Sequence, residues 1–251
     1  MSARRLAESV WMVGSGTDPA ALTSPYDCHV YLFDGGTEAL LVDAGTGLAT
    51  DRLLAAIAGT GCRGRLTHVL ITHSHADHAG GAAGLREATG VRVCASAETA
   101  AALRDGDEHR SQVAAARAAG IYPAGYRYPA CPVDEVAGDR TTWTVGSLTV
   151  TAHASPGHCD GHLCFLVEHA GRRALCTGDA IFHGGRVSIQ PIPDCRPYAY
   201  ARTAERLAEL DVDALLPGHG DIALDGAAAH LTAAADSFRR LVTPPNIVAE
   251  G

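Results

Sequence analysis

Short apolar runs recur along the chain, and most of them end at a glycine or a polar turn. Runs of four to seven residues with this pattern are typical of buried strands. Between them lie longer segments whose apolar residues recur three and four positions apart, as in amphipathic helices. Strands are predicted at 9–13, 28–34, 39–43, 68–71, 92–95, 141–145, 148–153, 163–168, 173–176 and 214–216.

The helical segments are distributed through both halves of the sequence. We predict helices at 49–57, 81–88, 97–120, 199–210 and 227–241. Strands and helices in both halves favour an α/β fold of stacked layers, two sheets covered by helices, over a single open parallel sheet. Because no linker or low-complexity tract interrupts the pattern, the simplest expectation is a single domain over residues 1–251.

The stretch 121–139 departs from both patterns, since it contains three prolines and three tyrosines. Long irregular segments in compact domains often form active-site walls or lids. A plain surface connection is the equally weighted alternative, and the sequence leaves both open.

Composition and charge narrow the classes of function. The chain is 47% hydrophobic and 19% charged, which is ordinary for a packed globular protein. A net charge of -8 without a Lys/Arg run disfavours nucleic acid as a partner. No N-terminal apolar segment is long enough for a signal peptide or a membrane span. The eight cysteines are scattered without a CxxC pair, so we expect reduced thiols and a cytoplasmic protein. The oligomeric state is not predicted.

The strongest chemical signal is a cluster of possible metal ligands in residues 73–78, His-Ser-His-Ala-Asp-His. Imidazole and carboxylate groups are ligands that zinc and similar divalent ions prefer. The cluster directly follows the predicted strand 68–71, and an extended backbone would project His73 and His75 to the same side. Three further strands each reach a glycine turn and then one more candidate ligand: His158, Asp179 and His219.

These motifs, together with Leu-Val-Asp-Ala-Gly at 41–45, resemble the metallo-β-lactamase superfamily. Five separated motifs occur in the expected order between Asp43 and His219, so the resemblance covers most of the chain. It implies the metallo-β-lactamase fold, a four-layer αββα sandwich, which agrees with the layers expected from the strand and helix pattern.

The resemblance also implies a role for each matching position. His73, His75 and His158 would bind one metal ion, Asp77, His78 and His219 a second, and Asp179 both. Asp43 would fix the site without binding metal, and His162 would support it from nearby. Seven ligands are too many for one tetrahedral zinc and suit two divalent ions about 3.5–4 Å apart. Zinc is the expected metal, with iron or manganese as alternatives.

The activity that the resemblance implies is hydrolysis. A hydroxide that bridges the two ions would attack a polarised carbonyl, and Asp77 would orient it and carry a proton toward the leaving group. The segments around His158 and Asp179 look most like the glyoxalase II-like branch. This branch favours a small-molecule acyl substrate, a thioester or an ester or lactone. Gly220 follows His219 where glyoxalase II has Glu, which speaks against glutathione thioesters in particular.

Candidate substrate contacts lie in the irregular stretch and after the predicted metal-bridging aspartate. A tyrosine hydroxyl could serve an oxyanion, and Phe182 begins a loop that could form a wall. For any single tyrosine ordinary packing is the favoured interpretation. The candidates are Tyr122, Tyr126, Tyr128 and Phe182. Cys159, beside a predicted ligand, is interpreted as a packed thiol rather than a nucleophile.

Three rival functions stay open. An iron-dependent oxidoreductase of the persulfide dioxygenase type shares the fold and the HxHxDH motif. A β-lactamase is a narrower alternative, although its zinc enzymes are usually exported and this chain shows no signal segment. A non-catalytic metal-binding regulator is the third.

Overall fold

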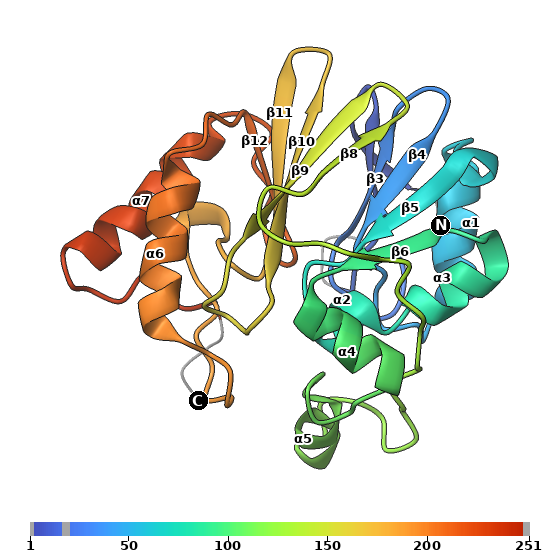
Figure 1. Cartoon of the computed structure of the whole chain (residues 1–251), viewed down its shortest axis with the longest axis horizontal. Coiled ribbons are helices and arrows are strands. Elements are labelled where there is room, and N and C mark those ends of the chain that lie inside the picture. The colour runs from blue at the N-terminus through green and yellow to red at the C-terminus, as the bar shows by residue number, and fades with distance from the viewer. Residues whose placement is uncertain (1–2, 17–20, 248–251) are drawn as a thin grey trace. The chain divides into compact units, whose positions relative to one another are not determined.

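The computed structural model describes residues 3–16 and 21–247 and divides the chain into two compact units. The first unit takes the chain up to Ala137 together with Val145–Ser147, and the second takes Gly138–Thr144 and the chain from Leu148 onward. Each unit has its own β-sheet and helices (Figure 1). That both units form one domain stays a prediction.

The first unit is built on a seven-stranded sheet in chain order. Its first four strands form antiparallel neighbours, and from the fourth strand onward the pairing is parallel. The carboxyl ends of these parallel strands are where an α/β fold places a site. The strands are β1 (Arg4–Ala7), β2 (Val10–Gly14), β3 (Val30–Asp34), β4 (Ala39–Val42), β5 (Leu66–Leu70), β6 (Arg92–Ala95) and β7 (Glu135–Val136).

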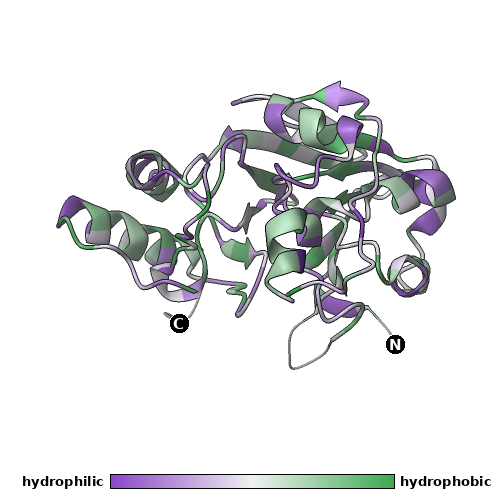
Figure 2. Cartoon of the chain, turned by 90° about the horizontal axis from the view of Figure 1, so that it is seen from below, coloured by the Kyte–Doolittle hydropathy of each residue, from purple (hydrophilic) through white to green (hydrophobic). Residues whose placement is uncertain are grey.

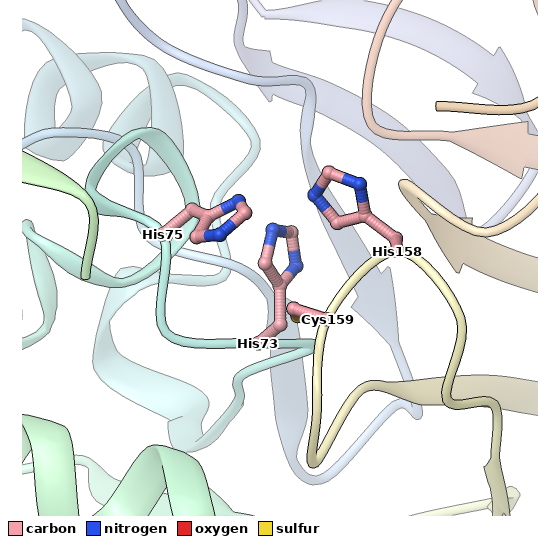
Figure 3. A group of neighbouring side chains, drawn as sticks. All are labelled: His73, His75, His158 and Cys159. Atoms are coloured by element: carbon pink, nitrogen blue, oxygen red, sulfur yellow. The ribbon is translucent and has the colours of Figure 1, made fainter. Parts of the chain in front are cut away.

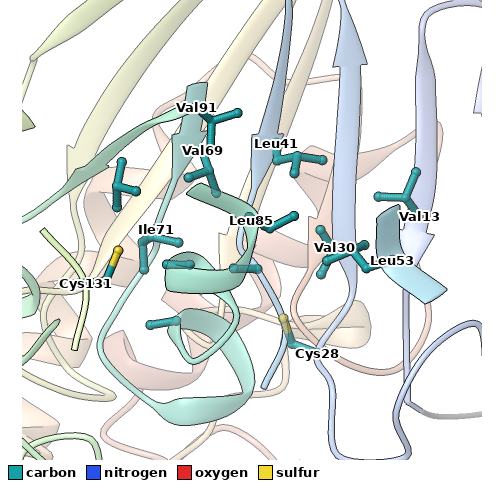
Figure 4. Packing of buried hydrophobic residues seen from close by; sticks show 14 of the residues in the cluster. Val13, Cys28, Val30, Leu41, Leu53, Val69, Ile71, Leu85, Val91 and Cys131 are labelled. Carbon is teal, nitrogen blue, oxygen red and sulfur yellow. The ribbon is translucent and has the colours of Figure 1, made fainter. Parts of the chain in front are cut away.

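Apolar side chains from the sheet and from the helices form the core of this unit. Leu41 and Val69 of the sheet belong to the same buried cluster as Leu53 and Leu85 of the helices (Figure 4). The helices are α1 (Thr50–Gly59), α2 (Ala76–Ala79), α3 (Ala82–Thr89), α4 (Ala97–Asp105) and α5 (Val113–Ala118), with a 3-10 turn, η1, at Arg63–Arg65.

The helix predicted over 97–120 is wrong as a single element. It divides into α4 and α5, because Gly106 ends α4 in the left-handed conformation with φ of 59°. Gln112, with φ of 61°, precedes the first turn of α5. The alanine-rich composition favours helix on both sides of the break, so it does not reveal the break itself.

The second unit is built on a five-stranded sheet in the order β12-β11-β10-β9-β8. The strands β9, β10 and β11 pair antiparallel, and β12 pairs parallel with β11. The strands are β8 (Thr142–Val145), β9 (Leu148–Ala154), β10 (Leu163–His169), β11 (Arg172–Gly178) and β12 (Ala214–Pro217).

Two long helices, α6 (Pro197–Ala208) and α7 (Ala227–Arg239), pack on each other in this unit (Figure 1). Their buried residues Leu207 and Leu231 join Leu166 and Leu215 of the sheet in one apolar cluster. Helices of both units carry apolar and polar residues side by side, as amphipathic helices do (Figure 2). A 3-10 turn, η2 (His183–Gly185), follows β11 and contacts α7.

The predicted class, mixed α/β with two sheets and helices, is confirmed, and the predicted strands recur with small shifts at their ends. Two short strands were missed. β1 lies in a polar segment with exposed residues, and β7 has two residues inside the irregular stretch. Neither has the apolar run on which strand prediction depends.

Two further expectations can be compared with the structure. Within the described ranges no helix is long and apolar enough to cross a bilayer. None of the eight cysteines, all of which the structure describes, forms a disulfide, and seven of them are buried.

Candidate metal centre

The histidine-rich cluster gathers its side chains at the end of β5, within the first unit. The rings of His73 and His75 lie with their centroids 4.6 Å apart, as expected for an extended backbone (Figure 3). His78 lies on α2, and its ring centroid is 4.2 Å from that of His73. Nε2 of His78 is 3.5 Å from Oδ2 of Asp77. The predicted ligands of this segment therefore do come together.

Asp43 supports this cluster from the turn after β4. Its carboxylate accepts hydrogen bonds from the Thr72 backbone N–H (2.8 Å) and from Nδ1 of His78 (2.8 Å). The Thr72 hydroxyl also donates to Asp43, at 3.0 Å from either oxygen. Because Asp43 adopts a left-handed conformation with φ of 65°, its backbone departs from an ordinary strand to make these contacts.

The partners of Asp43 determine which histidine nitrogens carry hydrogen. An ionised carboxylate only accepts, so His78 must donate from Nδ1. Since the single hydroxyl hydrogen of Thr72 goes to Asp43, Oγ1 of Thr72 accepts from Nδ1 of His73, 3.0 Å away. Both imidazoles therefore keep a lone pair on Nε2, which is the form a metal ligand needs.

Cys28 is a neighbour of this cluster that sequence reasoning did not assign. Its sulfur lies within 4.8 Å of ligand atoms of Asp43 and His78, and the residue is fully buried. Burial raises the pKa of the Cys28 thiol far above its usual value, so the thiol stays protonated. It packs against the cluster as a neutral group, and no motif in the sequence indicates this position.

The second unit brings together the other three predicted ligands, His158, Asp179 and His219. They follow β9, β11 and β12, each at a carboxyl end of its strand. Nε2 of His158 lies 3.6 Å from Oδ2 of Asp179. Nε2 of His219 lies 3.6 Å from the other oxygen, Oδ1. The two carboxylate oxygens thus face two different histidines.

Hydrogen bonds also determine the tautomers in this unit. Nδ1 of His158 donates to the carbonyl of Ser188 (2.9 Å), which leaves the lone pair on Nε2. His162 accepts at Nε2 from the backbone N–H of Asp179 (3.1 Å), so its hydrogen lies on Nδ1, which donates to Oγ of Ser155 (2.7 Å). His162 therefore holds the backbone of a predicted ligand. Cys159, drawn beside His158 in Figure 3, is fully buried.

The residues predicted to contact substrate differ in their exposure and in their contacts. Tyr126 and Tyr128 are buried, and the Tyr126 hydroxyl donates to the carbonyl of Thr46 (2.8 Å). Phe182 is 2% exposed, in the second unit. Tyr122 is half-buried, and its ring lies 5.8 Å from that of Tyr26, a partner that sequence reasoning missed. Of these four, Tyr122 is the most exposed.

The family model described as the metallo-beta-lactamase superfamily matches residues 23–219, which include all the residues described above as candidate ligands. The chain belongs to this superfamily. The match begins before the predicted strand 28–34 and ends at His219, so it spans parts of both units.

Curated relatives match this chain over about half of their own length. A hydroxyacylglutathione hydrolase from Pseudomonas savastanoi pv. phaseolicola is 34% identical over 61% of this chain and 46% of its own. An atrochrysone carboxyl ACP thioesterase from Aspergillus fumigatus is 27% identical over 77% of this chain and 51% of its own. The chain thus spans about half the length of these relatives, both of which are named as hydrolytic enzymes.

Solved structures named as metallo-beta-lactamases share the fold. A metallo-beta-lactamase from Cronobacter sakazakii aligns with a TM-score of 0.72 at 19% identity, covering 96% of this chain and 97% of its own. The native metallo-beta-lactamase from Legionella gormanii aligns with a TM-score of 0.71 at 18% identity, covering 96% and 95%. At these identities the likeness shows the fold alone, and it confirms the predicted metallo-β-lactamase fold.

Proposed function

We propose that this protein is a metal-dependent hydrolase that cleaves a small acyl substrate at a centre of two divalent ions. His73, His75 and His158 hold one ion, and Asp77, His78 and His219 hold the other. Asp179 binds both. Zinc is the metal that this set of imidazole and carboxylate ligands favours, because neither thiolate nor thioether is among them.

The observation that carries the proposal is the position of Asp179. Two ligand atoms at about 2.0–2.2 Å from one tetrahedral zinc are separated by about 3.4 Å. The separations of 3.6 Å on each side of Asp179 are close to this value, one for each carboxylate oxygen. The Asp77–His78 pair, at 3.5 Å, fits one ion in the same way. One carboxylate with a histidine at each oxygen suits two ions rather than one.

The tautomers support the same assignment. Three of the proposed ligands, His73, His78 and His158, each use Nδ1 to donate to an oxygen of the protein. Hydrogen bonds of this kind fix the ring orientation and raise the basicity of the ligating nitrogen. The donor set therefore fits a divalent metal on the chemistry of the side chains themselves.

Two divalent ions supply, when bound, Lewis acidity toward a carbonyl oxygen and a lower pKa for water. Asp77 is the residue of this chain placed for proton transfer. Its side chain is 19% exposed, whereas that of His78 is fully buried. It can accept a proton from attacking water and return it to the leaving group. No serine or cysteine nucleophile is needed, which agrees with the buried, protonated Cys28.

A thioester is the favoured substrate class, with an ester or lactone as the alternative. The two relatives described above are named for a glutathione conjugate and for a carrier-protein thioester. Both names describe an acyl group released from a thiol carrier. The match covers about half of each relative, so the acyl group and the carrier are not carried over. A lactam is less favoured, because the β-lactamase structures share only the fold at 18–19% identity.

The test combines metal analysis with a panel of substrates, both on the purified protein. We expect the protein to be cytoplasmic in the cell and its cysteines to be reduced. We expect two zinc ions per chain and turnover of acyl thioesters faster than of β-lactams. One iron per chain with oxygen uptake on a persulfide would overturn the proposal in favour of an oxidoreductase. Full metal occupancy with no turnover of thioesters, esters, lactones or lactams would favour a regulator. Asp225→Asn, on an exposed turn, serves as a control that leaves all values unchanged.

A further inference from the structure

Tyr200 of α6 is a fully buried tyrosine whose hydroxyl makes two hydrogen bonds to backbone. It donates to the carbonyl of Asp179 (2.7 Å) and accepts from the N–H of Ser188 (3.0 Å). Burial raises the pKa of Tyr200 well above its usual value, so the hydroxyl remains a neutral donor. All three residues belong to the second unit.

Both backbone contacts lead directly to proposed metal ligands. The carbonyl of Asp179 is held by Tyr200, and its N–H is held by Nε2 of His162. Two side chains therefore hold the two peptide groups that flank the Asp179 side chain. The carbonyl of Ser188 accepts from Nδ1 of His158, while the N–H of the same residue goes to Tyr200. The Tyr200 hydroxyl thus bonds directly to the backbone of one proposed ligand, Asp179. It also bonds to Ser188, the residue that accepts a hydrogen bond from the other, His158.

The loop before His158 also packs closely on α6. A Cβ on Gly157 would lie 2.6 Å from Cα of Tyr200, so only glycine allows this approach. The backbone N–H of Arg196, just before α6, donates to the carbonyl of Gly157 (2.8 Å). Thr203, one turn after Tyr200, donates to the carbonyl of Pro156 (2.7 Å). The first turns of α6 are therefore fixed relative to this loop.

We propose that Tyr200 is a positioning residue of the metal centre: its hydroxyl orients Asp179 and, through Ser188, fixes the tautomer and direction of His158. The inference rests on the proposed two-ion centre. Tyr200 touches neither metal nor substrate and acts through the backbone that carries the ligands. Partners of this kind change metal affinity by about 10–100-fold when they are removed.

The test is Tyr200→Phe, which keeps the ring and removes only the hydroxyl. Tyr198→Phe is the matched control, because Tyr198 lies on the same helix and is 93% exposed. Zinc affinity is measured by competition with a chromophoric chelator, without any substrate. We expect Tyr200→Phe to weaken the affinity for zinc by about 10–100-fold, and Tyr198→Phe to leave it unchanged.

Thermal unfolding of the metal-free and zinc-loaded forms separates positioning from plain stability. Loss of the hydroxyl leaves two buried backbone groups without this partner and lowers the stability of both forms. A ligand that binds only the folded state adds stability according to its affinity. We therefore expect the rise in Tm caused by zinc to be smaller in Tyr200→Phe than in the wild type.

The outcomes distinguish this inference from the proposal on which it rests. Equal loss of Tm in both forms, with zinc affinity unchanged, would overturn the role of Tyr200 and leave the metal centre standing. A wild-type protein that takes up no zinc would overturn both.

A measurement on the wild type covers the case in which Tyr200→Phe does not fold. Ser188 links Tyr200 to His158 through its backbone. A ligand that binds only the closed form makes local opening rarer, so zinc binding should slow exchange of the Ser188 amide hydrogen about tenfold. Unchanged exchange at Ser188 on zinc binding would count against the inference.

Discussion

The two halves of the proposed centre are built in different ways. In the first unit four proposed ligands lie within residues 73–78, and one buried carboxylate, Asp43, contacts the imidazole of His78 directly. In the second unit three proposed ligands come from three strand ends, and Tyr200 and His162 form hydrogen bonds with the backbone of one of them, Asp179. A compact motif can be supported at its side chains. Ligands that come from separate loops also need the backbone of those loops to be held in place, because each ligand moves with its own loop.

The largest effect is expected from Asp179→Ala, which removes the carboxylate that faces both His158 and His219. We expect turnover to fall by at least about 10³-fold, because the loss of one residue from a group that acts together in catalysis costs nearly as much as the loss of the group. At least one zinc ion per chain should be lost in metal analysis. Retention of both ions with wild-type turnover would remove Asp179 from its proposed position between the ions.

Asp43→Asn tests the support in the first unit and should have the next largest effect. The amide keeps the shape, but it cannot accept all three hydrogen bonds from Thr72 and His78. We expect zinc affinity to fall by about 10–100-fold. Urea unfolding of the metal-free protein should show a loss of about 1–3 kcal/mol, because buried donors lose their acceptor. Unchanged zinc affinity in Asp43→Asn would show that metal binding in the first unit does not depend on the Asp43 carboxylate.

Ser155→Ala sharpens the comparison at the backbone-directed support of the second unit. It removes the acceptor of Nδ1 of His162 and leaves the bond from the Asp179 N–H to Nε2 in place. Because this change acts two hydrogen bonds away from the proposed ligand Asp179, we expect a loss of zinc affinity near the low end of the range, about tenfold or less. Ser147→Ala, on an exposed turn, is the matched control. A larger loss than in Asp43→Asn would reverse the order proposed here.

The smallest effect concerns a surface ion pair that links the loop after His158 to the start of α6. Arg196 donates two hydrogen bonds to Asp160, each 2.6 Å long, and they hold the pKa of that carboxyl below its usual value. A lowered pKa stabilises the folded state at neutral pH, and this contribution is lost as the pH falls through the lowered value. Arg196→Met should lose this stabilising contribution at every pH above the range in which the Asp160 carboxyl is protonated.

Urea midpoints between neutral pH and the acid range measure this effect. We expect the wild-type and Arg196→Met curves to differ slightly at neutral pH and to converge in acid, since exposed pairs contribute little. Parallel curves over the whole range would show that the pair does not contribute through its charge.

Much of the candidate centre can be predicted from the sequence, because its candidate ligands stand in local patterns. An apolar run, a glycine turn and a ligand make a signal that is complete within a few residues, as at 215–219. Asp43 is found because it stands in a family motif next to its strand. The αβ class follows from periodicity for the same reason.

The supporting residues of the second unit have no such mark. Tyr200 lies in an amphipathic helix, where an aromatic residue usually indicates core packing. Its two partners lie 21 and 12 positions away in the chain, and only the folded backbone brings them to one hydroxyl. Tyr126 shows the reverse case. A tyrosine in an irregular stretch suggests substrate contact, but its hydroxyl donates to Thr46, 80 positions away.

The most direct test of the two-ion centre is a calorimetric titration of metal-free protein with zinc, in parallel for the wild type and His219→Ala. His219 is proposed for one ion only, and its side chain is 27% exposed, so its removal should spare the fold. We expect two zinc ions per chain for the wild type and one for His219→Ala. Saturation of the wild type at one ion, or the same stoichiometry in both proteins, would contradict this expectation.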